Sequence, residues 1–259
     1  MTGDAVRVTV DGPVATVTLA RPDRLNALDL AGMRLLAGRL RETAARPGVR
    51  CVVLTGEGRA FCAGADVSPA GAATGGADGR AIVAAANEVV LAVVRAGIPV
   101  VAAVNGPAVG VGVSFAVACD AVLAADTSWF QLPFVRIGLL PDGGATHLLP
   151  AAIGRVRASR MALFAERVPA PVALSWGLVS DVVPAADLLA TARALAAGTA
   201  GASREALRRT KRALGRAGAD ELEAAMRREL EDQGELLDGP DYAEGLSALR
   251  ERRDPVYPA

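Results

Sequence analysis

The chain has 259 residues, of which 52% are apolar and 3% aromatic, so Ala, Val and Leu must form most of the core. Its 28 basic residues balance 28 acidic ones, which argues against binding to nucleic acid or to a charged membrane surface. A chain of this length forms one large domain, or one core with a smaller appendage.

Strands and helices are expected to alternate along most of the chain. Residues 6–19 alternate in polarity on both sides of Asp11-Gly12, which predicts a β-hairpin. Further on, short continuous apolar runs predict strands buried on both faces, and runs with helical spacing predict helices. In chain order these are a helix over 28–48, a strand over 51–56, a helix over 80–97, a strand over 99–106, a helix after Gly112, and strands over 120–126 and 177–184. The alternation predicts an α/β core with partly parallel strands.

The strand pattern ends at about Leu188. Three segments, 202–214, 219–237 and 240–253, have helical spacing and predict a C-terminal helical appendage. Because three amphipathic helices are too few to bury a core of their own, we expect them to contact other copies of the chain. The expected division is a core over 1–197 and a helical oligomerisation module over 198–259.

The sequence shows no pattern that indicates a metal site, a signal peptide or a membrane span. His147 is the only histidine, and no CxxC or HExxH pattern occurs, so no metal cofactor is expected. Cys51, Cys62 and Cys119 stand in apolar strings and are expected to be buried and reduced. The N-terminus has no signal-peptide character and no long uncharged apolar run occurs, so we expect a soluble, cytoplasmic protein without a membrane partner.

Two glycine-containing turns follow predicted strands. They are "FCAGADV" (61–67), with Gly64, and "NGPAVGVGVS" (105–114), with Gly110. N–H groups at a helix start have partial positive charge and no intrahelical partner. Two such groups from different loops, aimed at one point, would hold an oxygen that becomes negative during a reaction. Either turn alone also fits an ordinary helix start, so only the pair indicates such a site.

Taken together, six segments resemble the crotonase superfamily, which comprises the enoyl-CoA hydratases and isomerases. In chain order they are "RPDRLNAL", "RAFCAGADV", "PVVAAVNGPAVGVG", "FQLPFVRIGLLPDGGATHLLPAAIG", "GLVSDVVP" and "DYAEGLSALRERRDPVY". They span nearly the whole chain. The resemblance implies an α/β fold with a crotonase-type ββα spiral core and a C-terminal helical trimerisation module, in a homotrimer or a dimer of trimers.

The resemblance also implies which residues form the site. Backbone N–H groups of Ala65 and Val111 would bind the oxygen of an acyl-CoA thioester and stabilise its enolate. Coenzyme A is then part of the substrate, and no separate cofactor is implied. The implied contacts to substrate and coenzyme A are Arg24 at a phosphate, Leu25, Ala27, Ala63 and Asp66 near the adenine, and Ala65, Val67, Ser114 and Phe134.

A single carboxyl group takes the place of the hydratase pair. Family hydratases use two glutamates, at positions that correspond to Ser114 and Phe134, and neither of these side chains can exchange a proton with an enolate. Asp142, in "IGLLPDGG", resembles the single acid of Δ3,Δ2-enoyl-CoA isomerases and of ring-opening isomerases of phenylacetate breakdown. An apolar setting that includes Phe130 and Leu140 would raise its pKa. The sequence therefore favours an enoyl-CoA isomerase with Asp142 as the base.

Several alternatives stay open on the sequence alone. Asp142 also fits the cap of a helix that begins at Gly143-Gly144, and Asp66 fits an N-cap. Asp120 is assigned no catalytic task. The chain as a whole also fits an enoyl-CoA hydratase (a lyase) of fatty-acid degradation, another enolate-forming reaction such as hydrolysis, or a non-catalytic acyl-CoA-binding protein. The position of Asp142 relative to the N–H groups of Ala65 and Val111 discriminates between these.

Overall fold

The main sheet of the protein has six strands. A computed structural model describes residues 5–68, 79–216 and 218–258. The strands are ordered β1-β2-β3-β4-β6-β9; β1 and β2 are antiparallel, and the other pairs are parallel. Their bounds are β1 Val6–Asp11, β2 Val14–Leu19, β3 Cys51–Gly56, β4 Val100–Val104, β6 Ala121–Ala125 and β9 Asp181–Val183. The predicted α/β core with a largely parallel sheet is confirmed.

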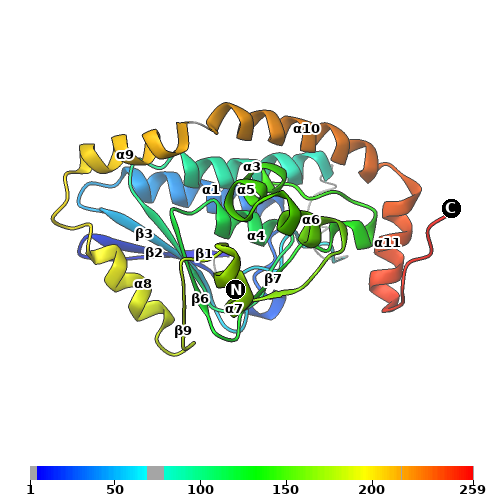
Figure 1. The fold of residues 1–259 in the computed structure, drawn as a ribbon, viewed down its shortest axis with the longest axis horizontal. Helices are drawn as coiled ribbons and strands as arrows, with labels where there is room; N and C mark the ends of the chain where they lie inside the picture. Colours follow the sequence, from blue (N-terminus) through cyan, green and yellow to red (C-terminus); the bar gives the residue numbers. More distant parts are fainter. Residues whose placement is uncertain (1–4, 69–78, 217, 259) are drawn as a thin grey trace.

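Helices surround this sheet (Figure 1). In the described ranges they are α1 Leu30–Ala45, α3 Gly79–Val94, α4 Val111–Val117, α5 Ala145–Ile153, α6 Arg155–Leu163, α7 Ala170–Trp176, α8 Leu188–Ala197, α9 Arg204–Arg216, α10 Ala219–Leu237 and α11 Pro240–Glu251, with the 3-10 turns η1 Pro22–Arg24 and η2 Phe134–Ile137. Figure 1 shows α9 and α10 along the top of the view, above α1 and α3. None of the helices in the described part of the chain is both long and apolar enough to span a membrane.

A second, smaller sheet escaped the sequence analysis. It joins β5 (Ala108–Val109), β7 (Trp129–Gln131) and β8 (Val168–Pro169), with β5 parallel to β7 and β7 antiparallel to β8. Strands of two or three residues are too short for an alternating pattern to be read. The sheet matters for the site because it holds β5 immediately before α4.

The predicted hairpin and the predicted buried strands are confirmed. Asp11 pairs with Val14, which leaves a two-residue turn between β1 and β2. In β3, Val52 and Leu54 point into the main core, whereas Cys51 and Val53 point into a second core beneath α8. Apolar side chains are thus needed on both faces, which explains why the strand reads as an uninterrupted apolar run.

The three predicted C-terminal helices, α9 to α11, are also confirmed. Helix α10 packs against α3 and α5 of the same chain, and α9 is tied to the core through Lys211. The ammonium group of Lys211 donates to the carbonyl oxygens of Val93 and Ile98 and, at 2.7 Å, to Oδ2 of Asp120. Asp120 therefore has a structural partner. The domain boundary near residue 198 stays a prediction.

Candidate active site

The loops that follow β3 and β4 lie side by side because these strands are parallel neighbours. The N–H groups of Phe61 and Cys62 donate to the carbonyl oxygen of Pro107 at 3.1 and 3.2 Å, and the N–H of Val109 donates to that of Cys62 at 2.9 Å. Helix α4 packs directly on this pair of loops, since a Cβ at Gly112 would lie only 2.4 Å from the Cys62 carbonyl oxygen. The two predicted glycine turns are therefore parts of one backbone cluster.

The N–H groups of Ala65 and Val111 belong to this cluster. Gly64 has a φ of +91°, and a Cβ there would lie 3.6 Å from the Val111 nitrogen and 2.9 Å from the Val109 carbonyl oxygen. Val111 is the first residue of α4, so its N–H has no acceptor in the helix. Within residues 5–68, 79–216 and 218–258, neither N–H group donates a hydrogen bond. Both donors are available to an oxygen from outside the chain.

The two segments predicted to contact coenzyme A also meet. The N–H of Ala63 donates to the carbonyl oxygen of Leu25 at 3.0 Å, and that of Asp66 donates to the carbonyl oxygen of Leu28 at 2.9 Å. Arg24 is exposed at the edge of this pair of segments, and its guanidinium donates to Oγ of Ser68 at 3.1 Å. The positively charged side chain of Arg24 thus lies beside the backbone segment that leads to Ala65.

Asp66 lies below this surface, and its carboxyl group binds three donors. Oδ2 accepts from the guanidinium of Arg21 at 3.2 Å, and Oδ1 accepts from the N–H and the hydroxyl of Ser68 at 3.2 and 2.6 Å. Ala27 is buried beside it, and Val67 is half-buried. No helix begins between Asp66 and Ser68, and a helix capped by Asp66 would extend over 69–78, outside the described residues.

Asn26 is a structural residue of this surface that the sequence analysis overlooked. It is fully buried with a φ of +59°, in the left-handed region. Its amide group donates to the carbonyl oxygens of Glu57 and Ala60 at 2.9 and 2.7 Å, and its carbonyl oxygen accepts from the N–H of Arg21 at 2.9 Å. The side chain therefore joins the loop after β2 to the loop after β3. An asparagine tolerates the left-handed conformation better than most residues.

Ser114 and Phe134 are the residues that the family resemblance places at the two hydratase glutamate positions. The hydroxyl of Ser114 is buried and donates to the backbone carbonyl oxygen of Asp142 at 2.8 Å. The ring of Phe134 lies over the turn before α4, 3.7 Å from where a Cβ of Gly110 would be. The backbone cluster of the two glycine turns is thus bordered by the Ser114 hydroxyl, which binds the Asp142 backbone, and by the apolar ring of Phe134. Their contact with substrate stays a prediction.

Asp142 lies against α4, close to Val111. The adjacent Gly143 packs so tightly that a Cβ there would come within 2.8 Å of the Val111 side chain and 3.0 Å of Cβ of Ser114. Asp142 is buried, with only 7% of the residue exposed. Its Oδ2 accepts from Nε2 of Gln233 at 3.3 Å, whereas its Oδ1 is buried and has no hydrogen-bond partner in the described part of the chain. One carboxyl oxygen is therefore held by a hydrogen bond, and the other is buried without one among the described residues.

The alternative role of Asp142 as a helix cap is wrong. The N-cap of α5 is Gly144, and no side chain of its own loop caps it. The capping acceptor is Glu229 of α10, whose carboxyl oxygens accept from the N–H groups of Gly144 and Thr146 at 2.7 and 2.9 Å and from the Thr146 hydroxyl at 2.6 Å. At the start of α5, Asp142 accepts only through its backbone carbonyl oxygen, from the N–H of Ala145 at 3.3 Å, so its carboxyl group has no capping role.

The pKa of Asp142 is raised from its ordinary value of 3.8 to about 7. Burial is the main cause, and the negative charge of Glu229 raises it further, against the opposing effect of the hydrogen bond from Gln233. The direction agrees with the sequence analysis, although the contribution of Glu229 was overlooked. A carboxyl group with such a pKa exchanges protons readily near neutral pH.

The raised pKa predicts how stability depends on pH. The folded protein binds the Asp142 proton more tightly than the unfolded chain does, so between about pH 4 and 7 the folded state holds more protons and stability falls as pH rises. Asp142→Asn removes this contribution. We expect the melting temperature of Asp142→Asn to exceed that of the wild type by more at pH 8 than at pH 5. Equal pH dependence of the two melting temperatures would contradict the burial of an ionisable Asp142.

Glu229 and Gln233 are buried polar residues beside Asp142 that the sequence analysis missed. They lie four residues apart on α10, in the same buried stripe as Leu222, Ala225 and Met226. Polar residues at two positions of an otherwise apolar, helically spaced stripe were the available signal, because buried polar groups require partners. Which partners they have is decided by how α10 lies across α5, and no local pattern gives that.

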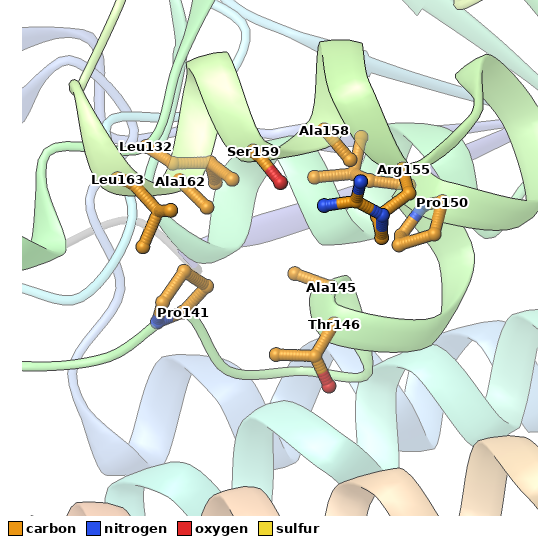
Figure 2. A pocket seen from close by; sticks show the side chains of 11 residues that line it. Leu132, Pro141, Ala145, Thr146, Pro150, Arg155, Ala158, Ser159, Ala162 and Leu163 are labelled. Atoms are coloured by element: carbon orange, nitrogen blue, oxygen red, sulfur yellow. The ribbon is translucent and has the colours of Figure 1, made fainter.

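A pocket of about 190 Å³ opens beside the Asp142 loop, between α5 and α6 (Figure 2). Pro141, Ala145 and Thr146 form one side, and α6 residues such as Ala158 and Ala162 form the other. Asp142 and the two backbone donors do not line it. The pocket therefore adjoins the candidate site through Pro141 without containing its chemistry. In the described ranges, no group of three or more His, Cys, Asp or Glu side chains is arranged to hold a metal ion.

Comparisons with known proteins agree with this architecture. A solved structure titled as an enoyl-CoA hydratase from Mycobacterium avium subsp. paratuberculosis superposes with a TM-score of 0.90, at 40% identity, over 98% of this chain and 99% of the other. A "Probable enoyl-CoA hydratase" of Rhodobacter capsulatus is 38% identical over 99% of both chains. The "1,2-epoxyphenylacetyl-CoA isomerase" of Escherichia coli is 36% identical over 96% of both chains.

The fold is that of the crotonase superfamily, as its motifs predicted. The enoyl-CoA hydratase/isomerase family model matches residues 9–259, and the chain belongs to that family of enzymes, which act on acyl-CoA thioesters. The relatives include proteins named for a hydratase and for an isomerase. The family alone therefore leaves the reaction undecided between these two.

Proposed function

We propose that the protein is an enoyl-CoA isomerase that shifts a double bond with Asp142 as its single acid–base group. The observation that carries the proposal is the Asp142 carboxyl group itself. It is buried beside α4, its Oδ1 has no partner in the described part of the chain, and its pKa is raised to about 7. A carboxyl group of that kind suits proton transfer to and from carbon.

The proposed reaction begins with a 3-enoyl-CoA. The thioester oxygen accepts hydrogen bonds from the N–H groups of Ala65 and Val111, and the Asp142 carboxylate takes a proton from C2. The C2–H electron pair delocalises through the thioester and the double bond, which gives a dienolate with its negative charge on the bound oxygen. The protonated Asp142 then returns the proton to C4, and the double bond comes to rest between C2 and C3. No water is consumed, and Asp142 ends in its starting state.

Hydration makes a different demand on the site. Adding water across a double bond needs one group to activate the water and another to protonate C2, and family hydratases use two glutamates for this. Here the corresponding residues are Ser114, whose hydroxyl is bonded to the Asp142 carbonyl oxygen, and Phe134. These two side chains are the reason for preferring isomerisation over the hydratase function that several relatives bear in their names.

The same proposal assigns the substrate contacts. The adenine of coenzyme A would lie beside Leu25, Ala27, Ala63 and Asp66, with Arg24 facing a phosphate. Coenzyme A arrives with the substrate, and the mechanism uses no separate cofactor or metal. We further propose a homotrimer or a dimer of trimers in which residues after about Leu188 supply much of the contact, because α8, α9 and α11 expose Leu195, Leu214 and Leu249.

A substrate screen tests the proposed function. Wild-type enzyme is assayed with 3-enoyl-CoA and 2-enoyl-CoA esters of several chain lengths, and with 1,2-epoxyphenylacetyl-CoA because one relative is named for that substrate. We expect isomerisation of a 3-enoyl-CoA with a kcat/KM far above that for hydration of the 2-enoyl-CoA of the same length. Efficient hydration, or binding of all esters without turnover, would refute the proposal.

A further inference from the structure

We propose that Gln233 and Glu229 of α10 are positioning residues for Asp142: Gln233 holds one oxygen of its carboxyl group, and Glu229 fixes the turn that carries it while opposing its ionisation. The inference deepens the proposed function and rests on it for its catalytic meaning. Its structural basis is the contact of one helix with both sides of the loop from Leu140 to Thr146.

Gln233 has only one amide orientation that satisfies its neighbours. The side chain is 1% exposed, and its Oε1 accepts from the N–H of Leu140 at 3.0 Å. Its Nε2 must therefore face Asp142, where it donates to Oδ2 at 3.3 Å. A donor at this place favours the carboxylate form and lowers the pKa of Asp142. The hydrogen bond also leaves Oδ1 as the oxygen free to meet substrate.

Glu229 acts on the other side of the loop. The residue is also 1% exposed, and its carboxyl group accepts from the N–H groups of Gly144 and Thr146 and from the Thr146 hydroxyl. Burial raises the pKa of Glu229 above its ordinary value, and these three hydrogen bonds, which favour the charged form, oppose that rise. The carboxylate places a negative charge near Asp142 and so disfavours a second one.

The other groups around Asp142 do not change the opposite signs of the effects of Gln233 and Glu229 on its pKa. From α4, the Ser114 hydroxyl donates to the Asp142 carbonyl oxygen, and Val111 packs against the adjacent Gly143; His147 of α5 lies toward Gly218 instead. On α10, Arg228 lowers the pKa of Glu229. The charged group that acts directly on Asp142 is Glu229. Removing Gln233 and removing Glu229 should therefore displace the Asp142 titration in opposite directions, which a merely structural role of α10 would not produce.

The test is a titration of the free enzyme that needs no substrate. The Asp142 carboxyl signal is followed by NMR in protein labelled with ¹³C at aspartate carboxyl carbons and is assigned by its loss in Asp142→Asn. We expect Gln233→Met to raise the pKa of Asp142 and Glu229→Gln to lower it, each by about one pH unit, the size expected for one hydrogen bond or charge at a buried carboxyl group. Exposed Glu231 of the same helix provides the control, and Glu231→Gln should leave the titration unchanged.

A second variant covers failure to fold. Gln233→Glu keeps the side-chain length, removes the donor and adds a like charge, so it should raise the pKa of Asp142 as Gln233→Met does. The inference would be overturned if substitutions at both positions moved the pKa of Asp142 in the same direction. It would also be overturned if the pKa did not move in variants that unfold as cooperatively as the wild type. Opposite displacements in an enzyme that isomerises no 3-enoyl-CoA would instead refute the proposed function and leave the role of α10 in the ionisation of Asp142 intact.

Discussion

Asp142→Ala is expected to lower kcat for isomerisation of a 3-enoyl-CoA by about 10²–10⁴-fold, the usual loss when a positioned general base is removed. The effect should fall on kcat because the carboxyl group acts on the carbon chain, whereas the thioester oxygen and coenzyme A bind elsewhere. Steady-state assays with wild type and variant measure it. Full isomerase activity in Asp142→Ala would remove Asp142 from the mechanism.

Two further variants control this experiment. Asp142→Asn keeps the shape of the buried side chain, and its affinity for coenzyme A esters should stay within a few fold of the wild type. Asp232 is exposed on α10, next to the buried Gln233, so Asp232→Ala should keep full activity. Ser114→Ala, which removes one hydrogen bond to the Asp142 backbone, should cost much less than Asp142→Ala. If Asp142→Asn abolishes binding, Asp142 is structural.

Gly64→Ala is expected to lower kcat by about 10²–10³-fold, the loss found when one oxyanion donor is removed. A backbone N–H cannot be deleted by changing its own side chain, but it can be displaced. A Cβ at Gly64 would lie 2.9 Å from the Val109 carbonyl oxygen, which is too close. The chain must therefore move away from Val111, and the N–H of Ala65 no longer points toward the oxygen that it should bind. Kinetics with a 3-enoyl-CoA and binding of coenzyme A esters measure the two parts of the effect.

Gly48→Ala separates this displacement from backbone strain. Gly48 has a φ of +84°, similar to the +91° of Gly64, but a Cβ there would meet nothing within 4 Å, and the residue lies in the turn after α1. Alanine in this conformation costs about 1–2 kcal/mol of stability at either position. Equal loss of activity in the two variants would show that strain, rather than the position of the Ala65 N–H, explains the effect.

The sequence predicted the parts of the fold that local patterns determine. The hairpin before Leu19, the apolar strands β3 and β4 and the glycine turns at Gly64 and Gly110 all followed from spacing and residue type. Their juxtaposition was implied only by the family resemblance; the structure gives the physical reason, because the two loops follow the adjacent parallel strands β3 and β4. Asp142 was singled out as the base through the resemblance of its turn to that of single-acid isomerases, once Ser114 and Phe134 were placed at the hydratase positions.

The surroundings of Asp142 were not predictable in the same way. Glu229 and Gln233 reach the loop from α10, and their partners depend on how that helix crosses α5 rather than on any nearby residue. The residue composition of the turn did not show whether Asp142 caps α5. The packing of α10 across α5 answers this, because it places Glu229 at the start of α5 instead. Short-range patterns can show that a buried stripe contains polar residues, but only the packed helices show which groups they bind.

The central claim is that this site moves a proton within the substrate and adds no water. One proton NMR time course with a 3-enoyl-CoA and wild-type enzyme follows both events at once, because the 2-enoyl-CoA isomer and its 3-hydroxyacyl-CoA hydration product have separate signals. The account predicts that the 2-enoyl-CoA accumulates to equilibrium while the hydrated product stays at the level of an enzyme-free control. Formation of 3-hydroxyacyl-CoA at a rate comparable to isomerisation, or a substrate that stays unchanged, would contradict it.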